Sequence, residues 1–222
     1  MVDIATYVFD AYGTLLDVHS AAQRLAGRIG PQAGELSRIW RQKQLEYTWI
    51  RAAAGRPATF RRMTEEGLDY AIAVTGPISP DLRRDLLAGY ETLAAYPEVP
   101  RVLAALKERG ARVAILSNGD RDMLARAVAA AGITEALDAV ISVEEAGVFK
   151  PASAVYALAT ARFGVAPAAI AFHSSNRWDI AGAKAFGFHT HWINRAGAPD
   201  EYPDLPADRI STNLETLLAD RC

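Results

Sequence analysis

An aspartate that closes a short apolar run is the first residue of this sequence that could do chemistry. The β-prone run Thr6–Phe9 ends at Asp10, and Gly13 and Thr14 follow within four positions. A carboxylate in a tight loop after a strand can act as a nucleophile when neighbouring groups keep it ionised. The same spacing is also typical of an ordinary turn that ends a strand. This segment alone leaves both interpretations open.

Three further polar clusters follow apolar runs or sit in loops. They are Ser117-Asn118-Gly119, Lys150-Pro151, and Ser174-Ser175-Asn176 with Asp179 beyond. Each also has a plain structural explanation, as a turn, a solvated surface charge, or the cap and first turn of a helix. No single cluster indicates a function, so the case for a site depends on whether the fold brings the clusters together.

Alternating strands and helices place these clusters along the chain. The predicted strands are Thr6–Phe9, Val113–Leu116, Ala139–Val143, Ala169–Phe172 and Thr190–Ile193. The predicted helices between them are Val99–Arg109, Asp120–Ala131, Ala152–Phe163 and Ile180–Phe186. Such apolar strands separated by helices indicate an α/β fold with a doubly wound parallel sheet, a Rossmann-like core. Because ligands bind at the carboxyl ends of parallel strands, the four clusters should converge there.

The segment 17–96 differs from the rest because it contains no convincing strand. Its apolar and aromatic residues recur three and four apart, as in Leu36, Trp40 and Tyr47, which is typical of amphipathic helices. The breaks at 55–57 and 76–77 predict about three helices, the last ending near Tyr96. We therefore predict a catalytic core of residues 1–16 and 97–222, with 17–96 inserted as a helical cap domain.

Composition excludes several classes of function. In 222 residues, 24 Lys and Arg balance 26 Asp and Glu for a net charge of -2, which disfavours a nucleic-acid partner. The only cysteine is Cys222, so no internal disulfide can form. No apolar run reaches the roughly 18 residues of a membrane span, and Asp3 and Asp10 do not suit a signal peptide. We expect a soluble cytoplasmic protein with no membrane partner.

Taken together, the four clusters resemble the motifs of the haloacid dehalogenase superfamily, over essentially the whole chain. Asp10 matches its nucleophile, Ser117 its second motif, Lys150 its third and Asp179 its fourth. Most members are phosphatases with a second Asp two residues after the nucleophile, which protonates the departing alkoxide. Here that position is Tyr12, so a poor leaving group would depart unprotonated. Neutral residues at 174–176 leave too few hard oxygen ligands for Mg²⁺, so we expect neither metal nor cofactor.

A halide leaves without a proton, and the longer matches resemble the L-2-haloacid dehalogenase branch. These matches are Phe9–Leu15, Gln44–Trp49, Leu116–Gly119, Val148–Pro151 and Ser174–Asp179. The resemblance implies that Asp10 displaces the halide of a short L-2-haloacid from behind, forming an ester. Water then cleaves the ester and yields the D-2-hydroxyacid. It also implies a homodimer.

The resemblance and electrostatics together assign the catalytic roles. Lys150 and Thr14 would hold the Asp10 carboxylate, where a cation ~4 Å away contributes about 4 kcal/mol at an effective dielectric constant near 20. Ser117 and the amides near Asn118 would bind the substrate carboxylate. The residues expected to orient and activate the hydrolytic water are Asp179, Asn176 and Ser174.

The halide and the substrate's alkyl part would meet a second group of residues. Arg41, on a cap helix one turn before Leu45, would receive the halide together with Asn118 and Trp178. The residues expected to line the substrate pocket are Tyr12, Gln42, Leu45, Phe60 and Trp178, with Ser117 and Asn118 at the carboxylate. For Leu45 and Phe60, ordinary core packing is an equally good interpretation.

Three histidines of the sequence are interpreted separately from the motifs. His173 stands where the family pattern has Val, and it either tunes the water-activating loop or, as we favour, bonds a backbone carbonyl. His189 and His191 share a strand face, but without a third ligand they do not indicate a metal site.

Two alternative functions remain open. The first is a superfamily phosphatase that has lost its general acid, and the second is a non-catalytic protein that binds a small carboxylate.

Overall fold

A six-stranded parallel sheet forms the centre of the computed structural model, which describes residues 4–219. Asp3 and Cys222, used above, lie outside these residues. The strand order is β3-β2-β1-β4-β5-β6, and every pairing is parallel. The strands are β1 Thr6–Phe9, β2 Arg112–Ser117, β3 Ala139–Ser142, β4 Ile170–Ser174, β5 His189–Ile193 and β6 Arg209–Ser211. The predicted α/β class with a doubly wound sheet is confirmed.

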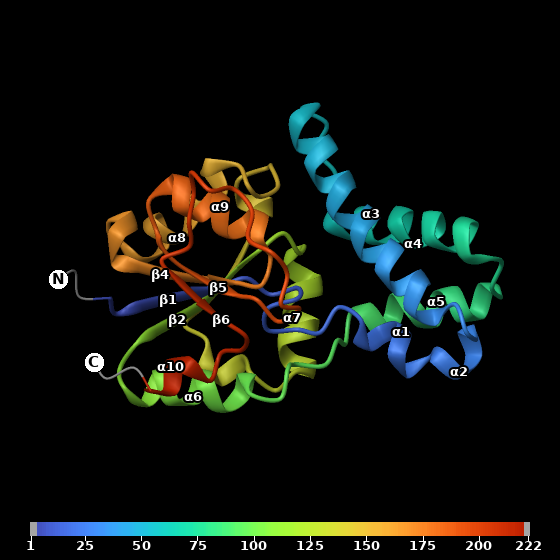
Figure 1. The fold of residues 1–222 in the computed structure, drawn as a ribbon, viewed down its shortest axis with the longest axis horizontal. Coiled ribbons are helices and arrows are strands. Elements are labelled where there is room, and N and C mark those ends of the chain that lie inside the picture. Colours follow the sequence, from blue (N-terminus) through green and yellow to red (C-terminus); the bar gives the residue numbers. More distant parts are fainter. Residues whose placement is uncertain (1–3, 220–222) are drawn as a thin grey trace.

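Helices cover both faces of this sheet, as parallel strands require. Helices α8 and α9 lie on one face, and α6 and α10 lie on the other (Figure 1). The helices of this part are α6 Val99–Glu108, α7 Arg121–Ala130, α8 Ser153–Phe163, α9 Arg177–Phe186 and α10 Thr216–Ala219. Short 3-10 turns occur at Thr134–Ala136, Val143–Glu145 and Pro167–Ala169. The residues Val113–Leu116 of β2 are fully buried, which explains their uninterrupted apolar sequence.

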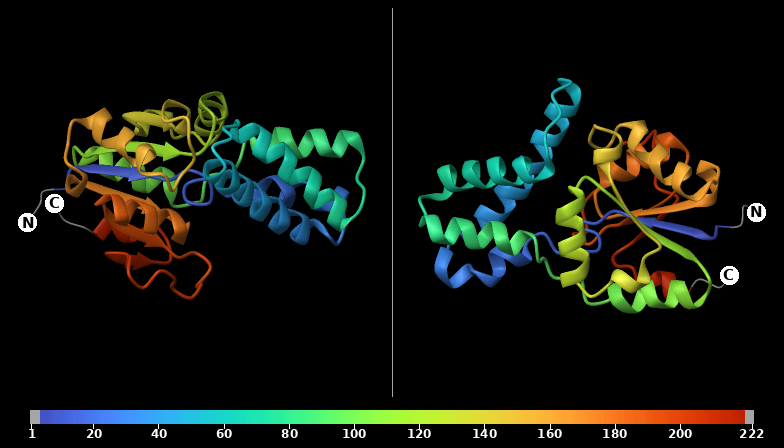
Figure 2. Two further views of the ribbon diagram at one scale, coloured as in Figure 1. Left: turned by 90° about the horizontal axis from the view of Figure 1, so that it is seen from above. Right: turned by 180° about the vertical axis from the view of Figure 1, so that it is seen from behind.

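Five of the six helices between β1 and β2 stand beyond one end of the sheet, and we call residues 20–90 the cap. They are α1 Ser20–Arg24, α2 Ala26–Ile29, α3 Ala33–Ala53, α4 Phe60–Thr75 and α5 Pro80–Tyr90. The strand arrows run toward the cap, so the carboxyl ends of the strands face it (Figure 2). The side chains of Thr59 and Ser79 accept N–H groups of the first turns of α4 and α5 and fix where these helices begin.

Several predicted boundaries were wrong. The segment 17–96 contains five helices instead of about three, because the short α1 and α2 lack a measurable period, and α5 ends at Tyr90. Strand β6 was missed since its three residues carry no alternating apolar pattern. Helix α9 begins at Arg177, three residues before the predicted start, so Asp179 lies in its first turn. Val143 belongs to a 3-10 turn rather than to β3.

The strand register explains why the polar clusters meet. Phe9 is paired with Ile115 on β2 and with His173 on β4, so Asp10, Ser117 and Ser174 follow at one level of the sheet. Within residues 4–219, no helix has the length and apolar character needed to cross a membrane.

Candidate active site

Asp10 is the centre of a buried hydrogen-bond network at the carboxyl end of β1. Its side chain is 7% exposed. Oδ1 accepts a hydrogen bond from Lys150 Nζ at 3.2 Å, and Oδ2 accepts from Thr14 Oγ1 at 3.1 Å and Asn176 Nδ2 at 2.8 Å. The Asp10 N–H is bound to the His173 carbonyl on β4, which fixes the loop to the sheet. Three donors therefore hold both oxygens of a nearly dry carboxylate.

Lys150 is fully buried between two carboxylates. Its Nζ lies 3.2 Å from Asp10 Oδ1 and 2.8 Å from Asp179 Oδ2, and 4.9 Å from the centre of the Phe172 ring. Burial opposes the charge of the ammonium, but Asp10 and Asp179 outweigh it and raise the pKa of Lys150. Burial also raises the pKa of Asp179, to about 6, although the Lys150 charge opposes that shift. The site therefore places one buried ammonium between the side chains of Asp10 and Asp179.

Tyr156 belongs to this network and was not identified from the sequence. Its hydroxyl donates to Asp179 Oδ1 at 2.7 Å, so Lys150 and Tyr156 hold the two oxygens of that carboxylate. The approach depends on Gly182 of α9, where a Cβ atom would lie 2.5 Å from the Tyr156 hydroxyl. Tyr156 lies on the buried face of α8, six residues after Lys150 but outside the motif, and its apolar neighbours suggested ordinary core.

The loops after β2 and β4 are closed by their own hydroxyl groups. Ser117 Oγ accepts from Gly119 N, and Ser174 Oγ accepts from Asn176 N, both at 3.1 Å. The side-chain oxygen of Asn118 accepts from Lys150 N at 2.9 Å. These contacts link the predicted second, third and fourth motifs. Asp179, however, lies on the Lys150 side of Asp10, whereas Asn176 lies on the Thr14 side.

Arg41 reaches from α3 of the cap to the loops around Asp10. Its guanidinium donates to Tyr12 O at 2.9 Å, to Asn176 Oδ1 at 3.3 Å and to Gln44 Oε1 at 2.8 Å. All three acceptors are uncharged. The cation therefore stands one side chain away from the nucleophile without being neutralised by these contacts.

Gln42 is the one predicted residue that points elsewhere. It is exposed, and its Oε1 accepts from Arg38 on the outer face of α3. The buried glutamine beside Arg41 is Gln44, which also bonds Thr64 Oγ1 and the Tyr90 hydroxyl. The helical period contained this signal, because positions 41, 44, 45 and 48 share one face whereas 42 does not.

Aromatic rings pack beside the nucleophile loop. Tyr12 lies 5.0 Å from Phe60 and 5.7 Å from Tyr90 between ring centroids. Trp178 meets Trp49 of the cap edge to face at 5.5 Å. Burial and the nearby Tyr90 raise the pKa of Tyr12 well above its usual value of 10, so its hydroxyl stays neutral.

Asp120 makes a second connection between the core and the cap. It follows Gly119 and is 5% exposed, and its two oxygens accept from Phe60 N at 2.8 Å and Arg61 N at 2.7 Å. These N–H groups belong to the first turn of α4, which has no partner for them within the helix. A carboxylate of the core thus caps a helix of the cap and positions Phe60 over Tyr12.

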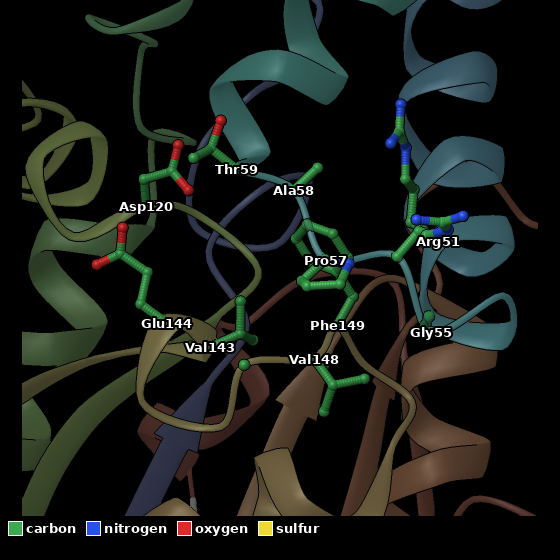
Figure 3. A pocket seen from close by; sticks show the side chains of 13 residues that line it. Arg51, Gly55, Pro57, Ala58, Thr59, Asp120, Val143, Glu144, Val148 and Phe149 are labelled. Atoms are coloured by element: carbon green, nitrogen blue, oxygen red, sulfur yellow. The ribbon is translucent and has the colours of Figure 1, made fainter.

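Two hollows border the site. One, of about 470 Å³, lies between the loop 55–59 of the cap and the core residues Asp120, Val143, Val148 and Phe149 (Figure 3). None of the predicted site residues lines it. The second, of about 390 Å³, is lined by four predicted residues, Arg41, Leu45, Asn176 and Trp178.

His173 lies behind the nucleophile and bonds a ring instead of the backbone carbonyl that we favoured. Its Nδ1 is 3.2 Å from His191 Nδ1, while His191 Nε2 is 2.8 Å from Ser211 Oγ, which donates to Asn213 O. The serine must therefore accept from His191 Nε2, and His191 Nδ1 must accept from His173. Burial, followed by His191 and Arg209, lowers the pKa of His173 well below 6.5, so the ring is neutral at pH 7.

The groups around Asp10 bind the Lys150 ammonium and do not form a set of metal ligands. The two carboxylates at the site already share Lys150, and the neighbouring donors are amide and hydroxyl groups. Within residues 4–219, no group of three or more His, Cys, Asp or Glu side chains is arranged to hold a metal ion. A Mg²⁺ ion does not fit this set, because the loop beside Asp10 contributes the neutral Ser174 and Asn176 and leaves few charged oxygen ligands.

Comparison with known proteins connects this geometry to a chemistry. The family model for haloacid dehalogenase-like hydrolases matches residues 4–187. The chain is 48% identical to (S)-2-haloacid dehalogenase 1 of Pseudomonas sp. (strain CBS-3), over 98% of this chain and 96% of that protein. A crystal structure of a dehalogenase matches with 41% identity and a TM-score of 0.96, covering 99% of this chain and 97% of that one. The L-2-haloacid dehalogenase of Xanthobacter autotrophicus with chloropropionic acid covalently bound matches with 36% identity and a TM-score of 0.87, covering 97% of both chains.

Proposed function

Because this chain belongs to the haloacid dehalogenase-like hydrolases, we propose that it hydrolyses short L-2-haloacids to D-2-hydroxyacids through an ester on Asp10. The near-full-length similarity to (S)-2-haloacid dehalogenases favours this reaction over the phosphatase and over a non-catalytic binding protein. The covalently bound chloropropionic acid of the Xanthobacter autotrophicus relative supports a covalent intermediate.

In the first step an oxygen of Asp10 attacks the halogen-bearing carbon from the side opposite the halogen. The carbon–oxygen bond forms as the carbon–halogen bond breaks, and the electron pair leaves with the halide. Arg41 supports this assignment, because its cation is bound only by uncharged acceptors in these contacts and can stabilise the departing anion. Attack from behind inverts the configuration of the carbon.

In the second step water attacks the carbonyl carbon of the Asp10 ester, and its proton passes to Asp179. The ester bond then breaks, the proton on Asp179 passes to the departing alkoxide to give the hydroxyacid, and the second proton of the water is released to solvent, which restores the Asp10 carboxylate. The raised pKa of Asp179, about 6, supports this role because it makes the carboxylate a stronger base than an exposed one while leaving it ionised at pH 7. Lys150 next to both carboxylates balances their charge through the cycle.

The substrate would bind to the loops and side chains around Asp10 and Asp179. The amide N–H groups near Asn118, with Ser117, are assigned to the substrate carboxylate, and Tyr12, Leu45, Phe60 and Trp178 to the alkyl part. The proposal for Phe60 gains support from its ring contact with Tyr12. Gln42 is replaced in the proposal by Gln44, whose buried amide bonds Arg41.

The observation that carries the proposal is the burial of Asp10 among three hydrogen-bond donors with no acid beside it. Tyr12, which stands where phosphatases of the superfamily have their acid, is a poor general acid because burial penalises the tyrosinate that it would leave. The absence of a metal requirement is part of the proposal, since Lys150 supplies the positive charge at the site.

The test is chloride release from the two enantiomers of 2-chloropropionate in the presence of a chelator. We expect release from the L enantiomer only, D-lactate as product, and a loss on the order of 10⁴-fold or more in Asp10→Asn. A single turnover in ¹⁸O-water with excess enzyme should place the label in Asp10 rather than in lactate. Turnover of p-nitrophenyl phosphate with Mg²⁺ and no chloride release would contradict the proposal.

Two features beyond the chemistry are also proposed. The resemblance to dehalogenases supports a homodimer, and the single cysteine supports a reducing, cytoplasmic location. Sedimentation velocity over a range of protein concentrations measures the first, and fractionation of the producing cells measures the second.

A further inference from the structure

Thr14 connects the nucleophile to the main chain of its own loop. Its hydroxyl donates to Asp10 Oδ2 at 3.1 Å and accepts the Ser175 N–H at 2.8 Å. A carboxylate oxygen can only accept, so the hydroxyl proton points at Asp10 and a lone pair points at Ser175. Thr14 is fully buried. The place of its hydroxyl against the carboxylate therefore depends on where the main chain of the loop lies.

Arg195 holds that main chain from outside the loop. It lies two residues after β5, and its Nη2 donates to the Thr14 carbonyl oxygen at 2.9 Å. The next carbonyl, that of Leu15, accepts the Tyr96 N–H at 3.0 Å. Two consecutive carbonyl groups behind the nucleophile are thus fixed by donors from distant parts of the chain.

The Arg195 side chain is itself fixed on two sides. Its guanidinium lies 3.7 Å from the centre of the Tyr96 ring, and its Nη2 is 2.7 Å from Glu98 Oε1. The side chains of Arg195 and Glu98 are 17% and 10% exposed, so salt and water screen this ion pair weakly. Because Glu98 balances its charge, Arg195 is suited to holding a carbonyl group rather than to binding an anion.

The same contacts lie where the chain passes between the core and the cap. Segments 15–17 and 94–96 run side by side there, joined by an antiparallel bridge between Leu16 and Ala95. The second segment carries the ring on which Arg195 stacks. Arg195 therefore links the connection between the two domains to the loop that carries the nucleophile.

We propose that Arg195 is a positioning residue for the dehalogenation proposed above, on which this inference rests. Its bond to the Thr14 carbonyl fixes the loop so that the Thr14 hydroxyl stays on the Asp10 carboxylate. The carboxylate then keeps the direction that attack on the halogen-bearing carbon requires. Arg195 acts through Thr14, so its effect lies in the rate of ester formation and not in substrate binding.

A double-mutant cycle tests this route by the rate of the first halide release, measured before steady state. Arg195→Met should lower the maximal rate with L-2-chloropropionate about 10–100-fold, because the nucleophile is misplaced, and should leave the half-saturating concentration unchanged. Thr14→Val removes the hydroxyl but keeps the shape of the side chain. Adding Arg195→Met to Thr14→Val should lower the rate by less than about twofold more.

Two results of this cycle would overturn the proposal. Equal losses from Arg195→Met in both backgrounds would show that Arg195 does not act through Thr14. A raised half-saturating concentration with an unchanged maximal rate would assign the cation to the anionic substrate.

Arg112 provides a matched control for the loss of packing. It begins β2, at the end of the sheet away from the cap. Its Nη1 donates to Phe163 O at 3.2 Å, and its guanidinium lies 5.3 Å from the centre of the Phe163 ring. Arg112→Met should therefore also lower the thermal stability, but it should not change the rate of ester formation. A similar loss of rate in Arg112→Met would reduce the effect of Arg195 to stability and overturn the proposal.

Hydrogen–deuterium exchange tests the positioning without any turnover. The main-chain N–H groups of residues 14–16 are bonded to the Ala11 carbonyl, so they are protected while the loop keeps its shape. We expect Arg195→Met to speed their exchange relative to the wild-type protein and to Arg112→Met. Faster exchange in a protein that releases no halide would refute the dehalogenase function alone. Unchanged exchange in Arg195→Met would overturn the role of Arg195.

Discussion

Two of the contacts between the cap and the core use opposite charges in opposite ways. At one, Asp120 of the core gives both oxygens to main-chain N–H groups of α4, at 2.8 and 2.7 Å. At the other, Arg41 of the cap donates to three uncharged oxygens, at 2.8 to 3.3 Å. The Asp120 carboxylate is fully used in holding the cap, whereas the Arg41 cation stays available to a ligand. The Asp120 contact is structural, whereas we propose that the Arg41 contact belongs to catalysis, although both cross the same boundary.

Removal of the Arg41 charge should have the largest effect on activity. We expect Arg41→Met to lower kcat/KM for L-2-chloropropionate by about 10²–10³-fold, because the halide loses its counter-charge, with little change in thermal stability. Arg38→Met, on the exposed face of the same helix, should change neither quantity. Near-normal activity in Arg41→Met would show that its charge is not used.

The pH dependence of kcat reports on Asp179, which belongs to neither of these two contacts. Burial and the Asp10 charge raise the pKa of Asp179 to about 6, and the Asp10 charge is absent from the ester. We therefore expect kcat to fall about tenfold per pH unit on a limb that lies below pH 6, as the base is protonated. The hydrogen bond from Tyr156 lowers that pKa, so Tyr156→Phe should move this limb to higher pH. The limb should keep its position in variants of Arg41 and Asp120. A limb that is the same in Tyr156→Phe would contradict the assignment to Asp179.

Removing the Asp120 charge should affect stability more than chemistry. In Asp120→Asn one side-chain oxygen still accepts from an α4 N–H group, but the other N–H group faces the NH₂ group of the asparagine. The free energy of unfolding measured in urea should therefore fall by about 1–3 kcal/mol. Asp122→Asn is the matched control, since its exposed carboxylate pairs only with surface arginines and should change stability by less than about 1 kcal/mol. If Asp120→Asn lowers activity as much as Arg41→Met, the distinction between the two contacts fails.

The smallest effect is expected behind the nucleophile, away from both contacts. The pKa of His173 is lowered in the folded state, so the unfolded chain binds the extra proton first as the pH falls below about 6.5. This contribution to stability is present above that pH and is lost in acid, with a slope of at most about 1.4 kcal/mol per pH unit. His173→Val should flatten the loss of stability between pH 7 and 5.5 in urea unfolding. Parallel slopes in the two proteins would refute the account.

Local sequence was sufficient where a polar residue directly follows an apolar strand. Asp10, Ser117 and Ser174 were predicted to meet because parallel strands end at one level, and the register of β1 with β2 and β4 brings them there. Lys150 and Asp179 were connected to them by family resemblance. The contacts that join Lys150 to both carboxylates follow from the tertiary fold.

The sequence could not identify residues whose role arises between distant elements. Tyr156 reaches Asp179 only because α8 and α9 approach each other at Gly182, and no spacing in the chain records that approach. Asp120 looked like the start of α7, and its bonds go to residues sixty positions earlier. Gln44 is a different case, since the helical period of α3 favoured it over Gln42.

The cap is anchored at Asp120 through the peptide backbone of α4, not through its side chains. Every amino acid except proline supplies the required N–H group, so a substitution at position 60 keeps this anchor. Phe60, which we propose to line the substrate pocket, can therefore be exchanged while the cap stays docked, which makes position 60 a natural place to alter substrate range by evolution or by engineering.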